Sequence, residues 1–286
     1  MAKAPLRIIV LARQDDARVR STRAELGEFL EAQPQTEVVA AEVDDDGSLE
    51  GYEADLVVVL GGDGAILRAC RMLGHHQLPI IGVNLGRLGF LADLSPEEFR
   101  ESFEEIRQRR FTVVEHLMFE CSLNRADGAS EIHLGLNEVA VLSADSLCMI
   151  DVHLTIDDEP VTTYSGDGVL VSTPVGSTAH NLAAGGPILR QDLQAFVITP
   201  ICPHTLTNRP VVDNASYVYR LSVPDAPEGI KLVIDGQIKL PLGNGDVVEV
   251  RKAPVSFKLA KIPGHSYYAT LHRKLGWGGQ PQYRAR

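Results

Sequence analysis

Short apolar runs and helix-like spacing alternate along the first part of the chain. Four apolar runs predict strands, at 6–12, 37–43, 56–60 and 79–85. The run 56–60 is apolar at every position, which is typical of a strand buried on both faces of a parallel sheet. Apolar residues at helical spacing between positions 19 and 30, and again up to position 72, predict the intervening helices. We therefore expect a doubly wound α/β domain.

A further helix is predicted to begin after Ser95. The Ser95 hydroxyl can cap the helix, Pro96 suits its first position, and Glu98 stands three residues after the cap. We expect this helix to run to about Arg109, where the character of the sequence changes.

From Phe111 onward, short strand-like runs follow one another with few helices between them. They lie at 136–142, 152–156, 169–172, 217–223, 231–234, 247–250 and 255–259. Several of them alternate apolar with polar residues, which predicts a mainly antiparallel second domain. We thus expect an α/β domain at 1–110 and a β-rich domain at 111–265. A tail at 266–286 could form a helix or could pack back on the first domain.

Composition and charge narrow the class of protein. The net charge of -11 argues against nucleic acid as a partner, because phosphate backbones select basic surfaces. No apolar run approaches the ~20 residues needed to cross a membrane, and the run near the start is interpreted as a strand rather than a signal peptide. The four cysteines are widely spaced without a CxxC pair, which indicates buried thiols in a reducing cytoplasm.

The strongest chemical signal is the turn Gly61-Gly62-Asp63-Gly64, which stands between a buried strand and a helix. Glycines let the backbone approach a ligand closely, and free N–H groups at a helix start attract phosphate. A carboxylate at such a turn can accept a proton from a hydroxyl that attacks a phosphoryl group, or can hold a metal ion on the phosphate donor. The alternative is a tight turn in which Asp63 only caps the helix.

Weaker signals follow along the chain. The loop 84–91 contains two glycines and follows another buried strand, at the edge where open α/β sheets bind ligands. The pair Asn137-Glu138 interrupts an apolar strand and suits hydrogen bonds to ribose hydroxyls, but a solvent-facing strand end explains it equally well. The segment 167–187 is interpreted as a strand, a Pro-Gly turn and a helix that opens at Ser177 or Thr178. The small residues from Gly176 to Gly186 indicate close backbone approach to a ligand or to another element, and 235–237 is interpreted as a hairpin turn.

Taken together, these segments resemble the bacterial NAD kinase family, whose members use ATP or polyphosphate. GGDG, NLGxLGF, NE, STPxGSTA with AGGPI, PICPH and DGQ occur in this order over about residues 55–240. The related phosphofructokinase-like and lipid kinases share GGDG but lack the long STPxGSTA segment. The resemblance implies a Rossmann-like, phosphofructokinase-like α/β domain followed by a mainly antiparallel β domain, with NAD in the cleft.

The resemblance also implies roles for particular residues. Asp63 would be the general base that takes the proton of the adenosine ribose 2′-hydroxyl, and Gly61 and Gly62 would form the phosphate loop. Substrate binding is implied for Gly64, Arg68, Asn137, Glu138, Asp167, Thr178, Ala179, His180, Asn181, Ala183 and Gln237. No cluster of protein side chains is implied for a metal; Mg²⁺ would accompany the phosphate donor.

The implied partners are NAD, NADP and either ATP or polyphosphate, with the protein a cytoplasmic homodimer or homotetramer and neither nucleic acid nor membrane as a partner. The sequence departs from the family where Ala65 replaces Thr, Val175 replaces Thr, His180 replaces Tyr, and Ser165 stands where Arg often occurs. Two alternatives stay open: a catalytically weak NADP(H)-binding regulator, and a GGDG-type kinase that acts on another hydroxyl, such as that of a lipid or a sugar.

Overall fold

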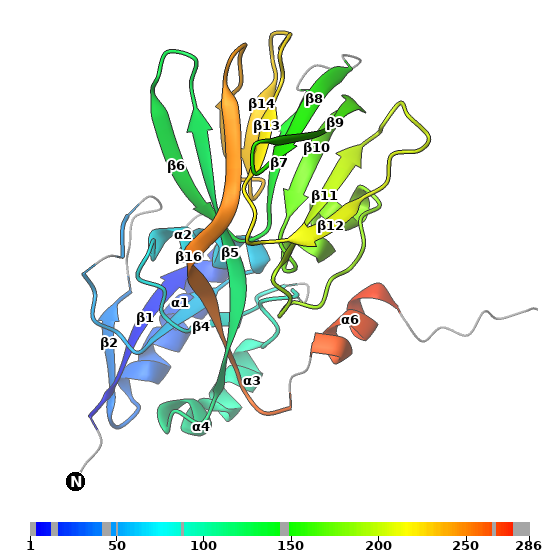
Figure 1. Cartoon of the computed structure of the whole chain (residues 1–286). Coiled ribbons are helices and arrows are strands. Elements are labelled where there is room, and N and C mark those ends of the chain that lie inside the picture. Colours follow the sequence, from blue (N-terminus) through cyan, green and yellow to red (C-terminus); the bar gives the residue numbers. More distant parts are fainter. Residues whose placement is uncertain are drawn as a thin grey trace, which may run out of the picture. The chain divides into compact units, whose positions relative to one another are not determined.

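The chain forms two compact units, residues Met1–Val114 with Lys258–Arg286 and residues Glu115–Phe257 (Figure 1). The computed structural model describes residues 4–12, 17–41, 47–49, 51–86, 89–143, 149–264 and 267–276. Within these ranges no helix is both long and apolar enough to cross a membrane.

The first unit is built on a sheet whose parallel strands lie in the order β2, β1, β3, β4. These strands span Leu6–Ala12 (β1), Thr36–Ala40 (β2), Leu56–Leu60 (β3) and Ile80–Val83 (β4). Every residue of β3 and β4 is buried, as predicted for strands covered on both faces. The strand order changes direction between β1 and β3. The carboxyl ends of these strands therefore form the edge at which open α/β sheets bind ligands.

Helices complete the first unit. They span Ala17–Glu31 (α1), Asp63–Met72 (α2), Pro96–Glu101 (α3), Phe103–Arg107 (α4) and Tyr267–Leu275 (α6). Leu26, Phe99 and Phe103 pack in one buried cluster with residues of β1, β3 and β4, so that α1, α3 and α4 cover this part of the sheet. The predicted doubly wound α/β fold of this part of the chain is confirmed.

The predicted helix start at Ser95 is confirmed, but the single helix to Arg109 is wrong. Ser95 Oγ accepts the Glu98 N–H at 3.1 Å, and Glu98 Oε2 accepts the Ser95 N–H at 2.7 Å. Ser102 then adopts φ -90° and ψ 0° and separates α3 from α4. Hydrogen bonds to Ser102 continue on both sides of the break, and no Gly or Pro marks it in the sequence.

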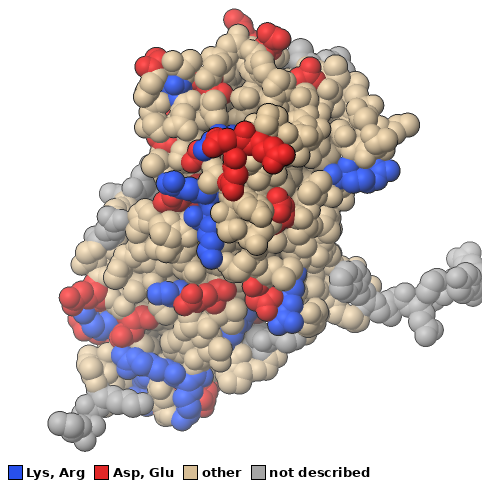
Figure 2. All heavy atoms as spheres, in the orientation of Figure 1, with Lys and Arg blue, Asp and Glu red and all other residues tan. Residues whose placement is uncertain are grey.

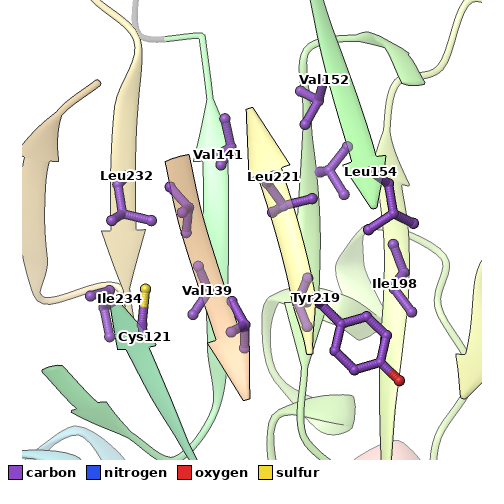
Figure 3. Close-up of a cluster of buried hydrophobic side chains, with 14 of the residues drawn as sticks. Cys121, Val139, Val141, Val152, Leu154, Ile198, Tyr219, Leu221, Leu232 and Ile234 are labelled. Carbon is purple, nitrogen blue, oxygen red and sulfur yellow. The ribbon is translucent and has the colours of Figure 1, made fainter. Parts of the chain in front are cut away.

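The second unit consists of two antiparallel sheets. In the first, β12 (Val211–Asn214), β11 (Ala195–Ile201), β10 (Gly168–Ser172), β7 (Glu138–Leu142), β14 (Lys231–Ile234) and β15 (Ile238–Pro241) are neighbours in that order. The second joins β9 (Glu159–Gly166), β8 (Ile150–Ile156), β13 (Tyr219–Ser222) and β16 (Val247–Lys261), and β16 also pairs with β5 (Thr112–Asn124), which pairs with β6 (Ser130–Gly135). Apolar side chains from both sheets form one core, in which Val139 and Ile198 lie with Tyr219 and Leu221 (Figure 3).

The two strands predicted at 247–250 and 255–259 are one continuous strand, β16. The charged residues and Pro254 between them interrupt the apolar pattern without ending the strand, because β16 stays paired with the neighbouring strands β5 and β13. The chain passes from the second unit to the first inside β16, where Leu259 pairs with Ile80. Along the chain, the boundaries between the compact units fall between residues 114 and 115 and between residues 257 and 258. The boundaries predicted from the sequence were between 110 and 111 and between 265 and 266.

Charged side chains lie intermixed on the face shown in Figure 2, with acidic and basic groups beside one another. Ion pairs occur at the surface of the first unit, such as Arg109 with Asp55 at 2.7 Å. Pairs of this kind at the surface contribute only about 0–1 kcal/mol each, so they carry little of the stability.

Candidate functional site

A tight turn connects β3 to α2. Gly61 has φ +142°, and a Cβ at this residue would lie 2.9 Å from the Cβ of Ala65, so that a side chain would be strained here. Gly62 is the residue that precedes α2, and the helix begins at Asp63 without a side-chain cap. Because Asp63 already lies inside the helix, the alternative in which it caps the helix is wrong.

The Asp63 carboxylate holds the loop that follows β4. Its Oδ2 accepts a hydrogen bond from the Phe90 N–H at 2.8 Å. Its Oδ1 accepts bonds from the N–H groups of Leu91 and Ala92, each at 3.0 Å. Hydrogen bonds to an ionised acceptor are among the stronger ones in proteins, so these three fix the carboxylate in place. The two glycine-containing motifs of the first unit therefore form one structure around a single side chain.

The loop 84–91 is shaped to receive this carboxylate. A Cβ on Gly89 would stand 2.0 Å from Oδ1 of Asp63, so only glycine leaves room for the side chain. Asn84 orders the start of the loop, because its Oδ1 accepts the Gly86 N–H at 2.8 Å. Two further residues of this motif, Arg87 and Leu88, lie outside the described residues.

In the second unit, the carboxylate of Asp235 holds the segment that carries Asn137 and Glu138. Its Oδ1 accepts the N–H groups of these two residues at 2.7 and 3.2 Å, and its Oδ2 accepts the Leu136 N–H at 3.0 Å. The Asp235 N–H donates in return to the Glu138 carbonyl at 2.9 Å. The hairpin predicted at 235–237 is confirmed, since β14 and β15 pair on either side of it.

Glu138 is buried rather than solvent-facing, with 6% of its surface exposed. Burial, and then the negative charge of Asp235, raise the pKa of Glu138 to about 8. Among the described residues, its Oε2 has no hydrogen-bond partner. A buried polar atom in this state is costly, and a protonated carboxyl group can both donate and accept a hydrogen bond. Glu138 is therefore equipped to bind a hydroxyl group of a ligand, and the solvent-facing alternative is wrong for it.

Replacing Glu138 by glutamine is expected to change how stability depends on pH. The folded chain keeps a proton on Glu138 that the unfolded chain loses above pH 4.5, so the contribution of this group is present below pH 4.5 and is lost as the pH rises toward 8. We expect the free energy of unfolding of the wild type, relative to Glu138→Gln, to fall by up to about 1.4 kcal/mol per pH unit in this window. Denaturant titrations of both proteins between pH 5 and pH 8 measure it, and parallel curves would contradict the assignment.

The helix predicted to open at Ser177 or Thr178 is short. It consists of a 3-10 turn at Gly176–Thr178 and the single-turn helix α5 at His180–Ala183. Both hydroxyls bond within the protein: that of Ser177 donates to the Pro174 carbonyl at 2.6 Å, and that of Thr178 donates to the Val175 carbonyl at 3.2 Å. These hydroxyls therefore stabilise the loop in the described structure.

The small residues of this segment allow close approach to other elements of the protein. A Cβ on Gly176 would lie 2.2 Å from the Asn137 carbonyl oxygen, and one on Gly186 would lie 2.0 Å from Oδ1 of Asn181. The Asn181 side chain is fully buried and accepts the Thr199 hydroxyl at 2.6 Å. The sequence left open whether these glycines approach a ligand or another element of the protein. The structure shows protein atoms at both of them, the Asn137 backbone at Gly176 and the Asn181 side chain at Gly186.

The remaining candidate residues differ in exposure. Gly64, Asp167, His180, Ala183 and Gln237 are exposed, and Arg68, Asn137, Thr178 and Ala179 are partly buried. The structure brings Gly61, Gly62, Asp63, Gly64 and Arg68 together in the first unit, and the other candidates belong to the second. In the part of the chain that the structure describes, no group of three or more His, Cys, Asp or Glu side chains is placed to hold a metal ion.

The local sequence around Asp235 indicates a turn and no further role for this residue. One feature could have indicated a further role. Asp235 and Gly236 both have positive φ, and a turn of this kind accepts Asn or Gly as readily as Asp, so the turn alone does not explain why an acidic residue stands there. Its bonds reach a segment 97 to 99 positions away in the chain, which no local pattern indicates.

Comparison with known proteins places both units in one family. Residues 22–111 match the ATP-NAD kinase N-terminal domain, and residues 136–262 match the ATP-NAD kinase C-terminal domain. An NAD kinase from Rhodopirellula baltica is 46% identical over 276 residues, which cover 96% of this chain and 88% of that relative.

Two solved structures share the fold. An NAD kinase from Archaeoglobus fulgidus, in complex with ATP, is 28% identical and aligns with a TM-score of 0.75 over 96% of this chain and 100% of its own. Yeast NADH kinase, in complex with NADH, is 24% identical and aligns with a TM-score of 0.88 over 99% of this chain and 90% of its own. The second likeness concerns the fold alone.

Proposed function

Because this chain belongs to the NAD kinase family, we propose that it transfers a phosphoryl group to the 2′-hydroxyl of the adenosine ribose of NAD, making NADP, with Asp63 as general base. The observation that carries the proposal is the fixed carboxylate of Asp63. It stands at a glycine turn after the carboxyl end of a buried parallel strand, and three backbone N–H groups hold it. A base positioned in advance in this way is what proton abstraction from a hydroxyl requires.

The proton acceptor in this proposal is Oδ2 of Asp63. Each carboxylate oxygen offers about two lone-pair sites. Among the described residues, Oδ1 accepts two N–H groups, whereas Oδ2 accepts only that of Phe90. The ribose oxygen forms a bond to the terminal phosphorus of the donor, its proton passes to Oδ2, and the bond from that phosphorus to the bridging oxygen of the donor breaks.

The side chains of Asn137 and Glu138 are proposed to hold ribose hydroxyls. Support comes from the buried Oε2 of Glu138, which has no partner among the described residues. Asn181 would contact the ligand through its backbone, because its side chain is bonded internally. The other substrate-binding positions of the proposal are Gly64, Arg68, Asp167, Thr178, Ala179, His180, Ala183 and Gln237.

The phosphate donor is proposed to be ATP or polyphosphate with Mg²⁺. Mg²⁺ usually keeps several waters and binds through the phosphates of the substrate rather than in an all-protein cage. Asp63 is the base in this proposal, so the ion would be held by the phosphates of the donor and by water. When bound, the ion neutralises charge on the phosphates. A homodimer or homotetramer in the cytoplasm remains part of the proposal.

We expect the purified protein to make NADP from NAD, Mg²⁺ and at least one of the two donors. An NADP-specific dehydrogenase measures the product, and separate reactions with ATP and with polyphosphate identify the donor. Reactions without donor are the control. NADP formation from neither donor, together with tight NADP binding by calorimetry, would replace the proposal with the NADP(H)-binding regulator. The absence of the usual hydroxyl at Ala65 is the observation that favours this second candidate.

A further inference from the structure

Asp235 stands in a turn that does not itself require an acidic residue. It follows β14 with φ +50°, and Gly236 follows it with φ +68°. Asn and Gly adopt such conformations at least as readily as Asp. Asp235 is nevertheless 5% exposed, and burial of a carboxylate is unfavourable unless hydrogen bonds compensate for it. The residue therefore serves something other than the turn.

Its hydrogen bonds show what it serves. Three consecutive N–H groups, those of Leu136, Asn137 and Glu138, point at its two oxygens at 2.7 to 3.2 Å. An amide in the same place would offer one acceptor oxygen and one NH₂ group, which cannot accept. The carboxylate is thus suited to this segment in a way that asparagine is not, even though its charge lies near the carboxyl group of Glu138.

The opposite side of the same segment is held as well. Thr173 Oγ1 donates to the Leu136 carbonyl at 2.5 Å, and the Thr173 N–H donates to the Asn137 carbonyl at 2.8 Å. Ser172 Oγ also lies 3.3 Å from the Asn137 carbonyl oxygen. The backbone N–H and C=O groups of this segment are therefore used inside the protein, which leaves the side chains of Asn137 and Glu138 for a ligand.

We propose that Asp235 is a positioning residue for NAD binding, which fixes the backbone of Asn137 and Glu138 so that their side chains meet the ribose hydroxyls. This inference rests on the function proposed above. Asp235 acts here as Asp63 acts in the first unit, because each carboxylate receives three consecutive backbone N–H groups. The substrate does not contact Asp235. Asp235 affects NAD binding only through the backbone of residues 136–138, which it holds in place.

The test compares Asp235→Asn with a matched control, Asp246→Asn. Asp246 is also buried and accepts two backbone N–H groups, those of Ala126 and Gly243, each at 3.0 Å, but it holds no candidate site residue. We expect Asp235→Asn to raise the KM for NAD, and the Kd for NAD in calorimetry, by about tenfold. The KM for the phosphate donor should stay within about twofold, since the fixed segment serves NAD. Asp246→Asn should lower the melting temperature without changing either constant for NAD.

A second variant guards against misfolding. Thr173→Val removes the hydrogen bond from the Thr173 hydroxyl to the Leu136 carbonyl, on the side of the segment opposite Asp235. Like Asp235→Asn, it should raise the Kd for NAD. Unchanged NAD constants in both Asp235→Asn and Thr173→Val, or an equal rise in Asp246→Asn, would overturn the inference. The activity of the wild type reports separately on the proposed function, because calorimetry with NAD measures the role of Asp235 even if no NADP forms.

Discussion

Replacing Asp63 by asparagine is expected to lower kcat for NADP formation by about 10² to 10⁴-fold, the usual effect of losing a general base. Asparagine has nearly the same shape but cannot take the proton of the ribose hydroxyl. It also presents one NH₂ group toward N–H groups that Asp63 now binds at 2.8 to 3.0 Å. Initial rates at saturating NAD and donor measure the loss.

The control for this variant is NAD binding. Asp63 acts on the reacting proton, so the Kd for NAD in calorimetry should stay within a few-fold of the wild-type value while kcat falls. A thermal melt checks that the substitution, which weakens the hydrogen bonds to the loop, has not unfolded the first unit. A variant that keeps more than a tenth of the wild-type kcat would show that Asp63 is not the base.

The second large effect is expected from Gly89→Ala. The new Cβ would stand 2.0 Å from Oδ1 of Asp63, and the short side chain of Asp63 cannot give way without breaking its bonds to Leu91 and Ala92. Misplacement of a catalytic group by about 1 Å can cost about 10²-fold in rate, and we expect a loss of kcat of this order. Initial-rate kinetics on the purified variant measure it.

Gly86→Ala in the same loop is the matched control for Gly89→Ala. A Cβ on Gly86 would meet nothing within 4 Å, and alanine keeps the N–H that donates to Asn84. This variant should retain kcat within about threefold, since surface substitutions away from special features have small effects. Equal losses of kcat in both variants would mean that the loop tolerates no added side chain. The loss in Gly89→Ala could then not be assigned to the displacement of Asp63.

The glycine turn of the first unit could be predicted because its signals are local. Five consecutive apolar residues followed by glycines indicate a buried strand and a tight turn, and β3 and α2 have these bounds in the structure. The contact between Asp63 and Phe90 could not be predicted in the same way. It joins positions 27 apart through backbone N–H groups, which have no signature in the sequence.

The mainly antiparallel fold of the second unit was predicted correctly, but local patterns could not decide two of its details, because tertiary contacts override them. Asn137 and Glu138 read equally well as ligand-binding residues or as a strand end, because burial of Glu138 depends on strands far away in the chain. The break in the pattern at Pro254 suggested two strands, but pairing with neighbouring strands carries β16 through it. The ordered set of motifs still identified the family, because this identification depends on the order of the motifs along the chain and not on their contacts in the fold.

The most direct test of the account is the position of the new phosphate on the product. NAD, Mg²⁺ and the active donor are incubated with the protein, and the purified dinucleotide product is analysed by ³¹P and ¹H NMR. The account predicts a single new phosphomonoester whose coupling places it on the 2′-oxygen of the adenosine ribose, and its absence from reactions with Asp63→Asn. A phosphate on any other hydroxyl, or no phosphorylated dinucleotide with either donor, would contradict it.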